Sequence, residues 1–176
     1  MNARISIAVL CALATPLATG CGSQSNASTQ SSTSAQVDGA KYLLPDEPEG
    51  AMGVIEARQL SEDGQELVLV GRIGGAANPW VEGRAAFTLL DPSMLVVDPE
   101  EGMAKGQLCT DDCCATERLE CTTIVKFVDA SGALVAIDAR KLLGVSEDDM
   151  VVVKGTAKRD KSGNFQLLAT GLHIRN

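Results

Sequence analysis

A series of short β-prone segments separated by turns limits most strongly how this chain can fold. These segments are rich in Val, Ile, Leu and Thr, and breaks such as Asn78-Pro79 and Asp91-Pro92 interrupt them. The predicted strands span residues 66–75, 84–90, 122–128, 133–137, 151–158 and 165–174. Many short strands joined by glycine-rich turns are typical of a small closed barrel. The sequence therefore predicts a mainly β fold.

The connections between these segments carry their own signals. Asp129–Gly132 and Asp160–Gly163 each place a glycine at the end of a short polar turn, which predicts two β-hairpins. A short helix is expected within residues 51–60. A second begins after Asp138 as N-cap and stops at Gly144. The expected fold is thus a small barrel with one or two short helices, interrupted by an irregular insertion over about residues 92–121.

The first twenty residues have the features of an export signal. One basic residue, Arg4, precedes an apolar run over residues 5–19, which is too short to span a bilayer and contains Pro16. The sequence Thr19-Gly20-Cys21 resembles the lipobox of bacterial lipoproteins, although Ala18 stands where that family prefers Leu. The resemblance implies cleavage after residue 20 and acylation of Cys21. Simple secretion and an ordinary buried cysteine are the alternatives.

A polar stretch follows the predicted lipid site. Residues 22–40 are almost entirely Ser, Thr, Gln, Asn, Ala and Gly, and this composition buries too little apolar surface to offset the entropy of ordering. A flexible chain of about twenty residues reaches roughly 25 Å. We therefore expect a tether over residues 21–45, a barrel domain over residues 46–176, and a lipid-anchored position in the bacterial cell envelope, on the periplasmic side or the cell surface.

Several features of the barrel segments occur together in one known family. A short helix precedes Gly71-Arg72-Ile73 in the first strand, and a Phe-Val-Asp-Ala-Ser-Gly turn, a small helix and the strand Val151–Gly155 follow. Over about residues 54–75 and 122–175 this order resembles the bacterial OB-fold family of small exported proteins. The resemblance implies a five-stranded barrel and an envelope location, and it supplies no enzymatic residues. Residues 76–121 depart from that family's compact plan.

The insertion concentrates thiols and carboxylates. The chain has six cysteines; Cys11 lies in the signal and Cys21 is the predicted lipid site. The remaining four are Cys109, Cys113, Cys114 and Cys121. An even number in an exported protein predicts disulfides, and because a bridge between the two adjacent cysteines would be strained, each is expected to pair with one of the outer two. Two bridges would hold an acidic loop closed.

Two other uses of these thiols remain open. Four thiolates can surround Zn²⁺ or hold Cu(I), and four neighbouring carboxylates would add negative charge as possible acidic contacts. These carboxylates belong to Asp111, Asp112, Glu117 and Glu120. The spacing differs from that of a paired CxxC site. A thiol oxidoreductase is the third interpretation, although no CxxC begins a helix to lower a thiol pKa.

Charge and motifs narrow the function further. Twenty-three acidic and 15 basic side chains give a net charge of −8, and few aromatic residues are present, so nucleic acid is an unlikely partner. A P-loop, a GxSxG elbow, an HExxH pair and an EF-hand loop are all missing from the sequence. These observations favour a non-catalytic protein with no cofactor, apart from Zn or Cu under the metal-binding alternative.

Trp80, His173 and a group of basic residues are further candidates for a functional role, and each also has a structural explanation. Trp80, in a loop after Asn78-Pro79, is a possible binding contact or a side chain that packs over the barrel end. His173, in the last strand, is expected to be structural or exposed. The basic residues of the last hairpin are expected to keep an edge strand soluble. They are Lys154, Lys158, Arg159 and Lys161.

Together these features predict a non-catalytic, lipid-anchored envelope protein. Its OB-like barrel would bind an unknown protein or small ligand with the help of the disulfide-closed acidic loop. A metal-handling envelope protein that uses the cysteine cluster is the alternative.

Overall fold

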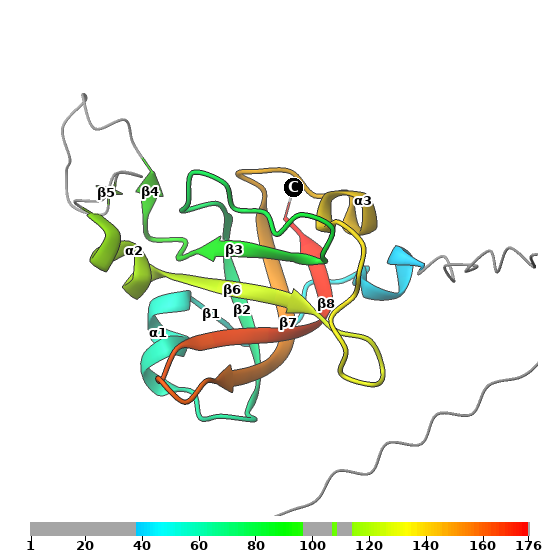
Figure 1. Cartoon of the computed structure of the whole chain (residues 1–176), viewed down its shortest axis with the longest axis horizontal. Coiled ribbons are helices and arrows are strands. Elements are labelled where there is room, and N and C mark those ends of the chain that lie inside the picture. The colour runs from blue at the N-terminus through cyan, green and yellow to red at the C-terminus, as the bar shows by residue number, and fades with distance from the viewer. Residues whose placement is uncertain (1–37, 97–106, 109–113, 176) are drawn as a thin grey trace, which may run out of the picture. The chain divides into compact units, whose positions relative to one another are not determined.

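Five strands close into a barrel in the computed structural model of the chain, which describes residues 38–96, 107–108 and 114–175 (Figure 1). The strands are β2 (Glu66–Ile73), β3 (Ala86–Leu90), β6 (Thr122–Phe127), β7 (Met150–Arg159) and β8 (Phe165–Ile174). They pair in the order β2-β3-β6-β8-β7, and β7 pairs back onto β2. Only the β6–β8 pairing within this ring is parallel. The predicted mainly β, OB-like barrel is confirmed.

Shorter elements surround the barrel. They are the 3₁₀ turn η1 (Gly39–Tyr42), β1 (Ala51–Met52), α1 (Val54–Leu60), β4 (Leu95–Val96), β5 (Gln107–Leu108), α2 (Ala115–Cys121) and α3 (Ala139–Leu143). Strand β1 adds to β2 in parallel, and β4 pairs with β5 in a separate two-stranded sheet. Figure 1 shows α1 and α2 together on one side of the barrel and α3 toward the opposite side. No helix of the described residues is long and apolar enough to cross a bilayer.

Alternating side chains from the five strands fill the barrel. Aromatic rings line up at one end of this core: Tyr42 meets Phe127 edge-on with ring centroids 5.5 Å apart, and Phe127 lies 6.2 Å from Phe87. Such pairs contribute about 0.5–1.5 kcal/mol each beyond the burial of their area. The hydroxyl of Tyr42 donates to the carbonyl oxygen of Val128 over 3.3 Å. The segment before β1 is therefore anchored in the core through Tyr42.

The long β7–β8 hairpin bends around the barrel with the help of a bulge. Lys154 pairs with Gly171 and Gly155 pairs with Ala169, so Thr170 has no opposite residue on β7. A bulge of this kind increases the local twist and bends the strand. At Gly155 a Cβ atom would lie 2.3 Å from the carbonyl oxygen of Leu168. Glycine therefore allows the two strands to approach closely where the hairpin bends.

An aspartate at the end of β3 fixes the start of α1. The Asp91 side chain, which is buried, accepts a hydrogen bond from the backbone N–H of Ile55 over 2.9 Å. Its other carboxylate oxygen accepts from the backbone N–H and the hydroxyl of Ser93. The first N–H groups of a helix have no partner within the helix, and a carboxylate also interacts favourably with the helix dipole. Asp91 thus holds α1 against the barrel although Gly53, at the N-cap position, offers no side chain.

Helix α3 begins and ends as the sequence predicts. Asp138 accepts a hydrogen bond from the backbone N–H of Arg140, and Gly144 follows the helix in the left-handed conformation with φ 69°. The guanidinium of Arg140 also donates to the Asp138 carboxylate, and this contact lowers the pKa of Asp138 to about 2. Arg140 further pairs with Glu82 over 3.0 Å. The cap is therefore charged throughout the neutral range.

The structure differs from the sequence predictions at three places. Residues 133–137 form no strand: Val135 bonds to the backbones of Phe127 and Ala85, and only a single bridge joins Leu134 to Val128. These contacts to the ends of β6 and the segment before β3 do not extend into a ladder within the described residues. The predicted tether boundary at residue 45 is too late, because Tyr42 belongs to the core. The insertion, predicted to be irregular, ends in α2, whose Glu, Arg and Leu residues favour a helix.

We expect Gly155→Ala to destabilise the barrel by about 1–3 kcal/mol, because its Cβ atom would collide with backbone atoms of β8 that cannot move independently. Gly171→Ala is the matched control, because the atoms nearest to its Cβ would belong to the Leu44 side chain, at 3.0 Å, and not to backbone. Urea denaturation of both variants measures the difference. Equal losses would show that close approach of the strands at Gly155 is not the constraint.

Candidate functional site

A cleft opens between α1 and α2, at the point where the insertion rejoins the barrel. Its volume is about 520 Å³, within the range of small-ligand sites. The lining residues are Ile55, Arg58, Gln59, Met94, Glu117, Glu120 and Cys121. Three of them, Glu117, Glu120 and Cys121, were candidate residues from the sequence. The fold therefore combines part of the predicted site with residues of α1 that the sequence did not indicate.

Packing beneath the cleft holds the two helices in place. Leu90 and Cys121 are buried together, with Ile55 and Met94 packed against them. Helix α2 runs directly into β6, and the Thr122 hydroxyl donates to the carbonyl oxygen of Arg118 at this junction. The cleft thus has an apolar floor, an acidic wall from α2 and a cationic wall from Arg58.

Cys121 lies in the cleft wall as a protonated thiol. Its Sγ atom donates to the carbonyl oxygen of Glu117 over 3.0 Å, and burial raises the pKa of the thiol to about 11. A thiol with such a pKa is a weak nucleophile near neutral pH, because the thiolate is the reactive form. Cys121 therefore lacks the low thiol pKa that a thiol oxidoreductase needs.

The predicted disulfides are not confirmed. Within the described residues no disulfide is found, and both Cys114 and Cys121 are buried. Cys109, Cys113, Asp111 and Asp112 lie outside the described residues, as does the lipid site Cys21. Across the described part of the chain, no group of three or more His, Cys, Asp or Glu side chains could hold a metal ion. Zn or Cu binding by all four thiols thus stays a prediction.

A second depression, which we call the Arg58 groove, lies over the start of β6. Its volume is about 280 Å³. It is lined by Arg58, Thr88, Leu119, Thr122, Thr123, Ile124, Asn164 and Phe165. It shares only Arg58 with the α1–α2 cleft. Neither the groove nor its arginine was found from the sequence, since the lining residues come from four separate stretches of the chain.

Trp80 packs on the barrel, as the second of its two sequence readings anticipated. Its ring lies edge-on to Phe87 with centroids 6.1 Å apart, and the Arg140 guanidinium covers it at 5.2 Å from the ring centroid. Trp80 lines neither the cleft nor the Arg58 groove. A role as a binding contact stays a prediction without support from this geometry.

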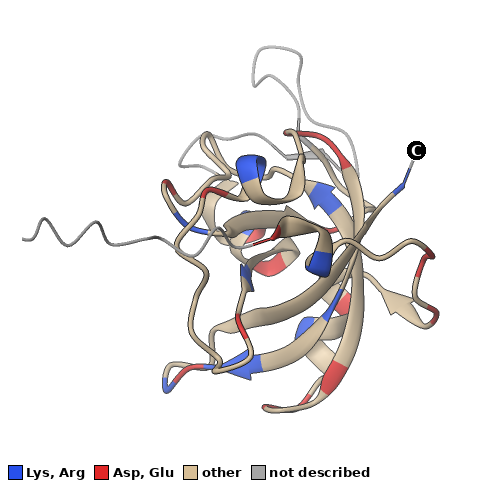
Figure 2. Ribbon diagram, turned by 90° about the vertical axis from the view of Figure 1, so that its right-hand side faces the viewer, with Lys and Arg blue, Asp and Glu red and all other residues tan. Residues whose placement is uncertain are grey.

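His173 and Lys158, two of the remaining candidates, have structural partners. The Nδ1 atom of His173 lies 3.1 Å from the carbonyl oxygen of Leu44, which ties the N-terminal segment to β8. Lys158 pairs with Asp63 over 3.0 Å. The edge-strand explanation for the basic residues is wrong, because β7 pairs with β2 on one side and β8 on the other. In Figure 2 the positions of basic and acidic residues are interspersed along the ribbon of the described part.

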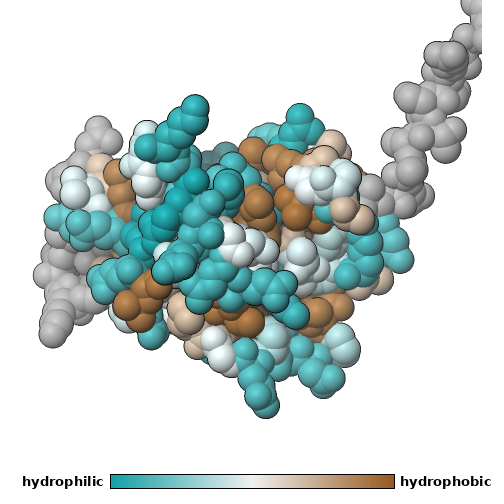
Figure 3. Space-filling view, turned by 90° about the horizontal axis from the view of Figure 1, so that it is seen from below, coloured by the Kyte–Doolittle hydropathy of each residue, from teal (hydrophilic) through white to brown (hydrophobic). Residues whose placement is uncertain are grey.

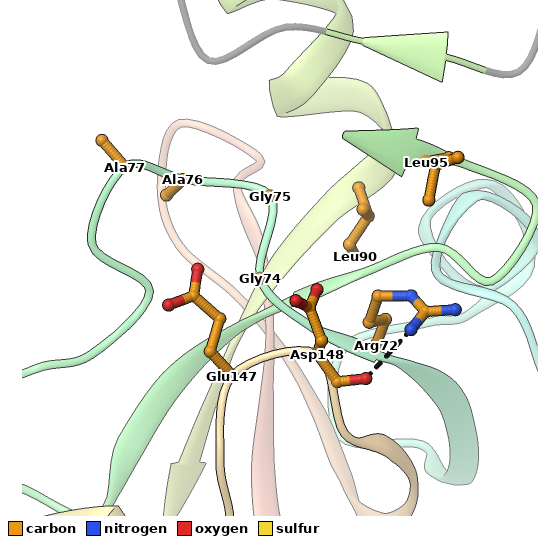
Figure 4. A pocket seen from close by; sticks show the side chains of 9 residues that line it. All are labelled: Arg72, Gly74, Gly75, Ala76, Ala77, Leu90, Leu95, Glu147 and Asp148. Atoms are coloured by element: carbon orange, nitrogen blue, oxygen red, sulfur yellow. Dashed lines mark hydrogen bonds between the residues drawn. The ribbon is translucent and has the colours of Figure 1, made fainter. Parts of the chain in front are cut away.

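A third cavity, of about 450 Å³, lies near the end of β2 (Figure 4). Figure 4 shows the carboxylates of Glu147 and Asp148 directed toward the backbone of residues 74–77, and Arg72 donating to the carbonyl oxygen of Asp148. Asp148 has φ 69°, a left-handed conformation that Asp tolerates better than most residues. None of the predicted site residues lines this cavity.

The comparisons with known proteins identify no relative. No family model matches the chain, and no curated protein sequence matches it. Among solved structures, the chain is similar to an OBody bound to hen egg-white lysozyme, with 14% identity and a TM-score of 0.37. That match covers 76% of this chain and 97% of the other. The family resemblance of the sequence therefore stays a prediction.

Alkylation of Cys121 in the reduced, folded protein should increase with pH up to about pH 11, since only the thiolate reacts. At pH 8 we expect roughly one Cys121 side chain in a thousand to be ionised, which makes the reaction slow. Iodoacetamide labelling followed by peptide mass spectrometry measures the rate at this residue. The same protein in urea is the control and should react faster, whereas equal rates in both would contradict burial of the thiol.

Proposed function

We propose that this chain is a non-catalytic, lipid-anchored protein of the bacterial cell envelope that binds a protein or small ligand at the α1–α2 cleft. One observation carries the proposal. The cleft brings Glu117, Glu120 and Cys121 from the acidic insertion against Arg58 of α1. An open concave surface with an apolar floor and a few charged groups is the usual form of a binding site.

The chemistry of the described residues supports binding over catalysis. Cys121 is held as a protonated thiol by its burial, and the imidazole of His173 contacts a backbone carbonyl. Nucleophilic catalysis requires a thiolate or another activated group beside a base, and general acid–base catalysis requires a group that reaches the reacting atoms. The cleft offers instead a cation, two exposed carboxylates and an apolar floor, which are groups suited to recognition.

The N-terminal sequence supports the proposed lipid-anchored location in the cell envelope. The apolar run before Cys21 and the polar stretch after it have the order of an export signal, a lipid site and a tether. Ordered packing begins by Tyr42, so the polar stretch up to residue 38 would link the lipid to the barrel. A chain of that length reaches roughly 20–25 Å, enough to hold a small domain off a membrane surface.

Replacing the acylated residue should release the protein from the membrane. We expect Cys21→Ser to move the chain from the membrane fraction to the soluble fraction, because a diacylated anchor is lost. Intact mass of the protein isolated from its native envelope measures the lipid directly, and the same sample with and without reduction and alkylation counts the bridged thiols. Cys11→Ser is the matched control. Membrane association that survives Cys21→Ser would contradict a lipid anchor at this residue.

Binding at the cleft can be tested by site-specific photo-crosslinking in cells. A photo-reactive side chain at Gln59, which is exposed and lines the cleft, should form a discrete adduct with the partner, whereas one at Lys141, exposed on α3, should not. Glu120→Lys should reduce the Gln59 adduct by reversing a charge in the cleft wall. Equal adducts from Gln59 and Lys141, or a yield at Gln59 unchanged by Glu120→Lys, would contradict the proposed site.

A further inference from the structure

Arg58 carries a positive charge that no carboxylate of the described residues neutralises by a direct ion pair. One of its terminal nitrogens, Nη2, donates to the carbonyl oxygen of Thr122, and its Nε atom is buried without a hydrogen-bond partner. Glu120 acts on this charge only from beyond ion-pair distance. A half-buried cation with an unsatisfied donor is costly unless another group compensates it.

A second arginine adds to this charge. The Arg159 guanidinium donates to carbonyl oxygens only, those of Arg58, Ser61 and Gly163. The two guanidiniums lie 6.0 and 5.4 Å from the ring centroid of Phe165, and Arg159 lowers the pKa of Arg58 after the larger effect of burial. Elsewhere Arg140 and Arg175 contact carboxylates directly. This arginine pair thus concentrates positive charge that no direct side-chain ion pair of the described residues neutralises, although Asp63 and Glu120 act on it from a distance.

The Arg58 groove gives an anion access to that charge. Its lining holds no acidic side chain. Of its polar side chains besides Arg58, Thr122 and Thr123 are buried and donate to the carbonyl oxygens of Arg118 and Phe165. The Asn164 amide nitrogen donates to the Asp160 carboxylate, which leaves the side-chain oxygen of Asn164 and the Thr88 hydroxyl for a ligand. The hydroxyl of Thr88 makes no hydrogen bond to other described residues and is free to contact a ligand. Leu119 and Ile124 supply apolar surface beside these groups, whereas Phe165 is buried beneath the two guanidiniums. On the face seen in Figure 3, the hydrophobic residues form separate patches among hydrophilic ones.

We propose that the Arg58 groove binds a peptide through a carboxylate that pairs with Arg58. A guanidinium and a carboxylate match in geometry and charge, and pairing would compensate the desolvated cation. The Thr88 hydroxyl and the side-chain oxygen of Asn164 match the hydrogen-bonding groups of a peptide backbone, and Leu119 and Ile124 accept an apolar side chain next to the carboxylate. This site goes beyond the proposed function, because it shares only Arg58 with the α1–α2 cleft.

The first experiment, on the full chain, tests whether peptide binding requires a carboxylate. Three short peptides with a fluorescent label at the N-terminus differ only in their carboxylates: one has a free C-terminal carboxylate, one a C-terminal amide, and one a C-terminal amide with a glutamate side chain. We expect the amide without glutamate to bind about ten- to a hundredfold more weakly than the best carboxylate peptide, measured by fluorescence anisotropy. The carboxylate peptide with the higher affinity shows whether Arg58 pairs with a C-terminal carboxylate or with a glutamate side chain.

Substitutions in the protein then test whether the peptide binds in the Arg58 groove. Arg58→Gln should weaken carboxylate binding about ten- to a hundredfold, whereas Arg84→Gln, which removes an exposed arginine outside the groove, should leave it unchanged. Leu119→Glu keeps the fold intact because Leu119 is 69% exposed, and its new charge should repel the carboxylate. Leu60→Glu is its matched control, since Leu60 is 67% exposed and does not line the groove.

Three results would overturn the proposal. They are equal affinity for the amide and carboxylate peptides, no binding of any peptide at millimolar concentration, and equal effects of Leu119→Glu and Leu60→Glu. The cleft is tested separately by Glu120→Lys, because Glu120 lines the cleft and not the groove. A chain with Glu120→Lys that still binds the carboxylate peptide would support the groove whether or not the proposed function holds.

Discussion

The pairing of β7 with both β2 and β8 is the constraint on which the rest of the structure depends. It closes the sheet, so the interior is sealed and every strand of the ring has two neighbours. Closure requires β7 and β8 to bend sharply, and the bulge opposite Lys154 and Gly155 makes this possible. Closure of the barrel therefore depends on Gly155, because a Cβ atom at this position would collide with the backbone of β8.

Closure leaves two barrel ends with different chemistry. At one end the rings of Tyr42, Phe127, Phe87 and Trp80 form a continuous aromatic row, and Arg140 covers its outer member. At the other end Phe165 lies beneath two guanidiniums and α1 packs beside it. In the first case the arginine is neutralised by carboxylates, and in the second the guanidiniums donate hydrogen bonds only to carbonyl oxygens. The first end is compensated by direct ion pairs, whereas the charge at the second end is the basis of the carboxylate site proposed above.

Helix α1 connects the barrel to both candidate surfaces. Asp91 fixes its start, Ala57 and Val54 pack in the core, and Arg58 projects between the cleft and the groove. Helix α2 completes the cleft and continues into β6 without a break. The two surfaces are thus built largely on helices and strands. A binding site on such elements loses little conformational freedom when it is occupied.

The sequence by itself determined the barrel class, the strands β2, β3, β6, β7 and β8, and the ends of α3. These features depend on neighbouring residues, such as the Asp138 cap, the Gly144 stop and the turns at Asp129 and Asp160, which local chemistry fixes. Only the tertiary structure decided that residues 133–137 form no strand, that Tyr42 belongs to the core, and that Glu117, Glu120 and Cys121 share a cleft with Arg58. Each of these depends on contacts between distant segments, as when Arg58 meets Thr122 and Arg159. Such contacts leave no periodic pattern in the chain, because burial and charge compensation are properties of the assembled fold.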